Sequence, residues 1–191
     1  MDSRAMVDPT SPDSRAESTV QQSVFEGLFV HVLEARPGTP LAEALRRAGY
    51  DVSRQEATYP RHVWIASLEA ACRVAYPQLS QEQAMRELGK SLIGGFFKTF
   101  AGRAVSLLAP MLGPEGVLKR MPRFFTMGSP GTQMTVHEEG PKAWRAEVRD
   151  RYVVPDFSAG VLETALEKAG VVGQVSVMDR AAGRCTLHVT W

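Results

Sequence analysis

Cysteine is scarce in this sequence, and the motifs built on it are missing. The chain of 191 residues has two cysteines, Cys72 and Cys185, and neither stands in a CxxC or another metal-ligand spacing. Both lie within apolar patterns, which is typical of buried free thiols in a cytosolic protein. The four histidines are far apart and form no HxxxH or HExxH motif, so their spacing gives no support for a metal site.

Long hydrophobic runs and an excess of one charge are missing too. No apolar run approaches the roughly 18 residues of a transmembrane helix, and the N-terminus lacks the hydrophobic centre of a signal peptide. We therefore expect a cytoplasmic protein without a membrane span. The formal net charge is +1, which gives no electrostatic reason to expect nucleic acid as a partner.

The signatures of common catalytic sites are absent as well. The sequence has no GxSxG nucleophile elbow and no Rossmann fingerprint, and Gly89-Lys90-Ser91 supplies only the end of a P-loop. Glu138-Glu139 flanks an expected hairpin turn, and Glu163 and Glu167 share the face of a helix opposite its apolar face. We expect all four carboxylates to be solvated. Enzymatic activity is therefore uncertain, and a protein without it is the favoured interpretation.

The composition fits one globular domain behind a disordered tail. Hydrophobic residues make up 44% of the chain and charged residues 23%, which is normal for a soluble protein of one domain. Residues 1–22 are rich in Ser, Asp, Arg and Pro and nearly free of large apolar side chains, so we expect them to be disordered. A single α+β domain is expected over residues 23–191, with a helical part at 23–125 and a ββ-α-ββ part at 132–191.

Helical patterns follow the tail. The segment from Val24 is apolar at helical spacing, but a strand over Val24–Val30 that leads into a helix also stays open. Thr39-Pro40 predicts the start of a short helix, with Thr39 as the N-cap. Pro60 and Pro77 bracket a core helix that should end near Tyr76.

The longest helical pattern runs from Ser80 to Leu112. Ser80 and Gln83 form a capping box, and the pattern is interrupted by Gly94-Gly95. Two glycines inside a helix weaken it, which is tolerated where the backbone bends or packs closely. We therefore predict a bend or close packing at this point.

Aromatic and basic side chains cluster after the two glycines. Their residues predict a pocket with an apolar wall and a cationic mouth, able to hold an amphipathic anion; the alternative is a plain core with a solvated cationic rim. The candidate ligand-binding residues are Phe96, Phe97, Phe100, Arg103, Arg120 and Arg123, with Lys119, Phe124 and Phe125 in the same cluster.

The character of the chain changes near residue 126. Residues 132–139 and 143–154 alternate between apolar and polar positions around the turn Gly140-Pro141-Lys142, which predicts a hairpin. A helix is expected over residues 157–169, followed by a second hairpin around Ala181-Ala182-Gly183. Helices followed by strands favour an α+β fold, with an N-terminal helical bundle packed on a C-terminal antiparallel sheet. Either the helix at 157–169 or the Phe-rich helix is expected to cover the sheet.

Several phrases of the sequence resemble a known family. VFEGLFV, YPRHVWIASLEAACRVAYPQLSQEQAMRELG, GFFKTFAGRAVSLLAPMLGPEGVLKRMPRFF and the closing VPDFSAGVLETALEKAG…VTW are similar to a large paralogous family of uncharacterised proteins in myxobacteria, from Val24 to Trp191. The order of elements is more distantly similar to haem–nitric-oxide-binding and vinyl-reductase-type ligand-binding domains. That resemblance implies a pocket between the helical bundle and the sheet. Haem-binding members carry a proximal histidine and a Tyr-x-Ser-x-Arg signature, and this sequence has no such signature, so the cofactor is unknown and haem is not supported.

Two functional hypotheses follow. The first is a non-enzymatic sensory or regulatory domain that binds a small apolar or amphipathic ligand, because the glycine break stands beside clustered Phe with Arg nearby. The second is a protein-interaction or homodimerisation module without a ligand, which would use an exposed helix face or an open sheet edge.

Overall fold

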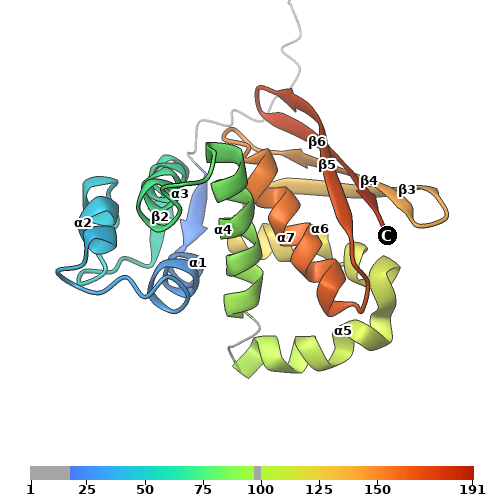
Figure 1. Cartoon of the computed structure of the whole chain (residues 1–191), viewed down its shortest axis with the longest axis horizontal. Helices are drawn as coiled ribbons and strands as arrows, with labels where there is room; N and C mark the ends of the chain where they lie inside the picture. The colour runs from blue at the N-terminus through green and yellow to red at the C-terminus, as the bar shows by residue number, and fades with distance from the viewer. Residues whose placement is uncertain (1–17, 97–99) are drawn as a thin grey trace, which may run out of the picture.

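The chain folds as a helical part joined to an antiparallel sheet (Figure 1). The computed structural model describes residues 18–96 and 100–191, with side chains described except at 100–108. In the described chain up to Gly128 the elements are helices and two short strands, and two hairpins with a helix between them follow. The predicted α+β class with a ββ-α-ββ end is confirmed.

The N-terminal part is built around an aromatic cluster. Strand β1 (Thr19–Gln21) pairs antiparallel with β2 (Thr58–Pro60), so the structured chain starts within the tail expected at 1–22. Helix α1 (Gln22–Phe25) and the π-helix η1 (Glu26–Val30) follow, which decides the open choice over Val24–Val30 for a helix. The aromatic cluster consists of rings that contact one another, and its members are Phe25, Phe29, Tyr50, Tyr59 and Trp64.

The predicted helix starts and ends are present. Helix α2 (Pro40–Arg47) is capped by Thr39, whose Oγ1 accepts a hydrogen bond from the Ala42 amide at 3.2 Å. Helix α3 (Arg61–Ala75) lies between Pro60 and Pro77. Ser80 and Gln83 exchange the two hydrogen bonds of the capping box, at 3.1 and 3.2 Å.

The longest predicted helix is two helices instead of one. Helix α4 (Gln81–Phe96) and helix α5 (Phe100–Leu118) run in different directions (Figure 1). The predicted close packing is found at Gly95, where a Cβ atom would lie 2.2 Å from Cγ2 of Val32. Inside α5 the chain kinks at Gly113, whose φ of 65° suits glycine. Helix α6 (Met121–Gly128) follows.

The C-terminal sheet has the strand order β3-β4-β6-β5 and is antiparallel throughout. Its strands are β3 (Gln133–Gly140), β4 (Ala143–Arg149), β5 (Gln174–Ala181) and β6 (Arg184–Thr190). The alternation predicted the inward face correctly, because Trp144, Ala146 and Val148 are buried. Helix α7 (Pro155–Lys168) covers the sheet, and α4 packs on α7 (Figure 1).

Helices α4 and α7 cross with their backbones in contact. A Cβ atom on Gly89 would lie 2.1 Å from the carbonyl oxygen of Phe157, and one on Gly160 would lie 2.0 Å from that of Arg86. Glycine at both positions is therefore a requirement of the crossing. The crossing joins the helical part to the layer that covers the sheet.

Ion pairs flank this crossing and correct one expectation. Glu163, expected to be solvated, is largely buried and accepts a hydrogen bond from Arg86 at 2.8 Å, with Lys90 at 3.7 Å. Asp156 pairs with Arg180 of β5 at 2.7 Å. The face of α7 opposite its apolar stripe is covered by α4, which helical periodicity within α7 does not reveal.

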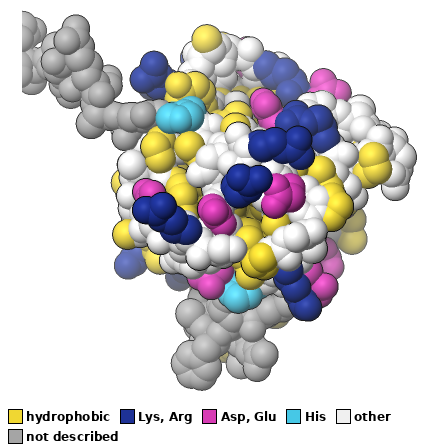
Figure 2. Space-filling model, turned by 90° about the vertical axis from the view of Figure 1, so that its left-hand side faces the viewer, with side chains coloured by type: hydrophobic (Ala, Val, Ile, Leu, Met, Phe, Trp, Pro, Cys, Tyr) yellow, Lys and Arg dark blue, Asp and Glu magenta, His cyan; other side chains and the backbone are white. Residues whose placement is uncertain are grey.

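The surface is charged in a mixed pattern. Figure 2 shows Lys and Arg side chains interspersed with Asp and Glu on one face, with apolar side chains scattered between them. Among the described residues, no helix is both long and apolar enough to cross a membrane.

The two cysteines are buried free thiols, as predicted. Burial raises the pKa of Cys72 and of Cys185 to about 11. We expect neither thiol to react with Ellman's reagent in the native protein at about pH 8, and both to react at once in guanidinium, because the thiolate is the reactive form. Rapid modification of the folded protein would contradict this.

The same pKa shifts predict alkaline instability. An unfolded thiol ionises near its ordinary pKa of 9, whereas the folded protein keeps the proton until about 11. The unfolded state therefore binds fewer protons in this window, and the free energy of unfolding should fall as the pH rises from about 9 to about 11. A variant with alanine at both positions should lose part of this slope in urea titrations.

Candidate functional site

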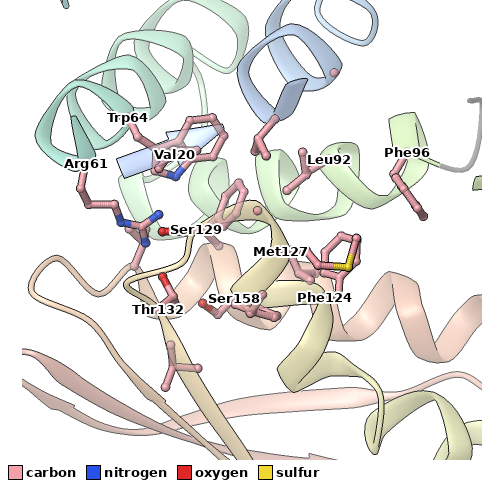
Figure 3. A pocket seen from close by; sticks show the side chains of 18 of the residues that line it. Val20, Arg61, Trp64, Leu92, Phe96, Phe124, Met127, Ser129, Thr132 and Ser158 are labelled. Atoms are coloured by element: carbon pink, nitrogen blue, oxygen red, sulfur yellow. The ribbon is translucent and has the colours of Figure 1, made fainter. Parts of the chain in front are cut away.

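A cavity of about 370 Å³ lies between the helical part and the sheet with its covering helix. The helical part lines it from β1, α1, η1, α3 and α4, and the rest of the lining comes from α6, β4, α7 and the loops beside them. Its position agrees with the pocket implied by the resemblance to haem–nitric-oxide-binding domains. Figure 3 shows the labelled side chains converging on this space from both parts of the fold.

Most of the cavity wall is apolar. Its larger apolar side chains are Val20, Val24, Trp64, Leu92, Phe96, Phe124, Phe125, Met127, Val148, Val153, Val154, Phe157 and Val161. Phe96 and Phe124 contact each other edge to face, with ring centroids 5.5 Å apart. Met127, beside them in Figure 3, is 67% exposed. This apolar end therefore opens to solvent.

The opposite end of the cavity is polar and closed. Arg61, Ser129, Thr132 and Ser158 lie there (Figure 3), and each is less than a tenth exposed. Nε of Arg61 lies 3.3 Å from Oδ2 of Asp150, whose carboxylate has no exposed surface. Thr132 donates its hydroxyl hydrogen to the same carboxylate oxygen. Arg61 and Thr132 thus line this end of the cavity, and both contact the buried carboxylate of Asp150, which lies outside the lining.

The backbone holds this ion pair in place. The Arg61 amide donates to the carbonyl of Ser18 at 2.8 Å, and Nη2 of Arg61 donates to the carbonyl of Tyr152 at 3.4 Å. The Tyr152 amide donates to Oδ1 of Asp150 at 3.1 Å. Burial lowers the pKa of Arg61 and the Asp150 charge opposes this shift. A guanidinium keeps its proton in proteins, so the pair is ionic.

Some of the predicted ligand-binding residues line the cavity, and others do not. Phe96 lines it, together with Phe124 and Phe125 of the same predicted cluster. Phe97 and the side chains of Phe100 and Arg103 lie outside what the structure describes. Arg120 and Arg123 are exposed and do not belong to the described lining, and Nη1 of Arg120 donates to the carbonyl of Gly116 at 2.8 Å. Lys119 lies over the Trp144 ring, 5.4 Å from its centroid.

The polar end was not predicted from the sequence, although one signal for it exists. Trp144, Ala146 and Val148 alternate on the inward face of β4, and continuing the alternation by one step places Asp150 inward as well. A carboxylate on a buried face needs a charged partner. Its partner Arg61 follows a helix-starting proline some ninety residues earlier, and no local pattern marks it.

The described lining contains no His, Cys or Tyr side chain. His31, His62 and His137 are exposed, His188 lies on the outward face of β6, and none of the four lines the cavity. Within residues 18–96 and 100–191, no three His, Cys, Asp or Glu side chains gather closely enough to hold a metal ion.

Solved structures of H-NOX proteins have a fold similar to that of this chain. The Fe(II) unliganded H-NOX protein from K. algicida aligns with a TM-score of 0.65 at 12% identity, over 89% of this chain and 95% of that one. An oxygen-binding H-NOX domain related to soluble guanylate cyclases, in its oxygen complex, aligns with a TM-score of 0.63 at 12% identity, over 88% and 92% of the chains. The H-NOX from Shewanella woodyi aligns with a TM-score of 0.61 at 15% identity, over 88% and 93%. At these identities the likeness establishes the fold.

The described residues of this cavity do not fit haem, a group whose distortion has been studied in the H-NOX family. Haem iron in proteins is held by His, Cys or Tyr, or by Met together with His. The sulfur of Met127 is the only such group in the described lining, and residues 97–108 contain no His, Cys, Tyr or Met. The guanidinium of Arg61, which could face a propionate, is already paired with Asp150.

The comparison with curated proteins found no match. One family model matches residues 18–191, which is most of the sequence and the whole of the described fold. The chain therefore belongs to the family described as Protein of unknown function (DUF2378).

Proposed function

We propose that this chain is a non-enzymatic sensory or regulatory domain that binds a small apolar or amphipathic ligand in the cavity between its helical part and its sheet. The observation that carries the proposal is the cavity itself, which has an apolar wall, an apolar opening at Met127 and a buried polar end at Arg61. Ligand pockets in proteins have this composition, with few polar groups set in a mostly apolar lining.

The fold supports a ligand-responsive role. The fold is similar to that of an oxygen-binding H-NOX domain, and the cavity of this chain lies between its helical part and its sheet, where a ligand would contact both. A ligand held there touches α3 and α4 on one side and α7 on the other. Ligand binding would therefore change the position of the helical part relative to the sheet.

Native mass spectrometry of freshly purified protein is the direct test. We expect a mass above that of the polypeptide, lost on denaturation, from a co-purified apolar molecule. We also expect the neutral fluorophore N-phenyl-1-naphthylamine to bind and to change the emission of Trp64, which lines the cavity.

A matched pair of variants links binding to the cavity. Leu92→Trp fills the lining from a partly buried position and should weaken probe binding at least about tenfold, because the added volume occupies the site. Leu79→Trp makes the same change in the exposed loop before α4, outside the lining, and should leave binding unchanged. Equal binding by both variants, or no probe binding to the unaltered protein, would contradict the proposal.

A further inference from the structure

The polar end of the cavity carries no net charge. Arg61 is the one charged side chain of the described lining, and it is paired with Asp150, which is buried beside it and does not belong to the lining. The pair is buried on both sides, because the Arg61 side chain is 11% exposed and that of Asp150 is not exposed at all. A ligand head that reaches this end therefore meets a guanidinium whose charge is already balanced.

An anionic head is disfavoured at such a site. Burying an ionised carboxylate is costly unless an opposite charge compensates it. Arg61 is the only compensating charge in the described lining, and a second carboxylate beside it would share it with Asp150 and be repelled by Asp150. A cationic head would be repelled by the guanidinium of Arg61 and would also be buried without an opposite charge of its own. The exposed Arg120 and Arg123 do not help, since they lie outside the lining.

Hydrogen-bond donors remain available at the same end. The structure gives Nη1 of Arg61 no protein partner in the described chain, while Nε and Nη2 face Asp150 and Tyr152. The hydroxyl of Ser158, 4% exposed, also lines the cavity without a hydrogen bond to any described residue. Figure 3 shows the guanidinium of Arg61 and the side chain of Ser158 beside the space where a ligand head would lie, and leaving buried donors unpaired is costly.

We propose that the cavity selects amphipathic ligands with an uncharged hydrogen-bond-accepting head, such as an alcohol, ketone, ester or amide, and holds them head-inward with the apolar tail toward Met127. This inference rests on the proposed function and specifies the class of ligand for the same site. The donors Arg61 and Ser158 bind the head, and Leu92, Phe96 and Phe124 contact the tail.

Competition against N-phenyl-1-naphthylamine with ligands of one chain length tests the selectivity in the unaltered protein. We expect 1-decanol to displace the probe at least about tenfold better than decanoate or decylammonium at neutral pH, because the charged heads lose hydration without gaining a free counter-charge. Decane should also bind more weakly than 1-decanol, because it leaves the two donors unpaired. Decanoate should compete better as the pH falls toward its pKa, since the protonated acid is neutral.

Two variants test the roles of the residues. Asp150→Asn removes the balancing charge, so the preference for 1-decanol over decanoate should shrink or reverse. Ser158→Ala should weaken 1-decanol binding several-fold and leave decane binding unchanged. Ser67→Ala is its matched control, since Ser67 is buried on α3 but does not line the cavity. If Asp150→Asn does not fold, the ligand series and Ser158→Ala carry the test.

The outcomes separate this inference from the proposed function. Decanoate binding as well as or better than 1-decanol would overturn the uncharged-head selectivity while the cavity remains a binding site. Decane binding as well as 1-decanol would overturn the role of the donors. If neither the fluorophore nor any of the four chains binds, the proposed function itself is overturned.

Discussion

Replacing Gly160 with alanine should destabilise the protein severely, by about 3 kcal/mol or more. The new Cβ would lie 2.0 Å from the carbonyl oxygen of Arg86, a backbone atom that cannot move aside without displacing α4. Gly89→Ala should have the same effect, because its Cβ would lie 2.1 Å from the carbonyl oxygen of Phe157. The measurement is the free energy of unfolding in urea, with circular dichroism as the signal.

Gly94→Ala is the matched control for this prediction. It makes the same substitution in α4, the helix that contains Gly89, but a Cβ at Gly94 meets no atom within 4 Å. Alanine is the better helix former, so this variant should be as stable as the unaltered protein or more stable by up to about 1 kcal/mol. If Gly160→Ala and Gly94→Ala unfold at the same urea concentration, the crossing is not as close as described.

Replacing Asp150 with asparagine should cost about 3–5 kcal/mol of stability, because it leaves the Arg61 guanidinium buried without its counter-charge. The carboxylate also accepts hydrogen bonds from the Thr132 hydroxyl and the Tyr152 amide. Asparagine keeps the shape of the side chain, so the loss reports mainly the charge. The midpoint and slope of a urea unfolding curve measure this loss of stability.

An exposed ion pair supplies the comparison. Oδ2 of Asp179 lies 3.2 Å from Nη2 of Arg184, and both side chains are nearly half exposed. Asp179→Asn should therefore change stability by less than about 1 kcal/mol. An Asp150→Asn variant as mild as Asp179→Asn would mean that water reaches Arg61, and the polar end of the cavity would not be closed.

The elements of this fold could largely be predicted, because the signals for them are local. The capping box at Ser80 and the hairpin turns at Gly140-Pro141-Lys142 and Ala181-Ala182-Gly183 each depend on residues close in sequence. The division of the expected long helix into α4 and α5 has a weaker signal, since the glycines precede it. The pattern predicted a bend or close packing at the glycines, but it did not predict that the segment forms two separate helices.

The site was harder to predict, because its polar end joins distant segments. Phe96 could be named from the sequence, since it stands in a dense aromatic cluster. Arg61 and Asp150 are far apart in the chain and become partners only when α3 meets the loop after β4. Glu163 was misjudged for the same reason, since its partners Arg86 and Lys90 lie on another helix. Periodicity within one helix reports which faces are apolar, and it does not report what the polar faces contact.

The contact of Gly89 and Gly160 also limits how the cavity can change its volume. Helix α4 carries Leu92 and Phe96 on one wall, and α7 carries Phe157, Ser158 and Val161 on another. Where the two backbones touch, no side chains lie between them that could compress or swell. The two helices can therefore rotate relative to each other about this contact, but the distance between them cannot become shorter. A larger ligand would widen the cavity by changing an angle, and that rotation would carry the whole helical part with it.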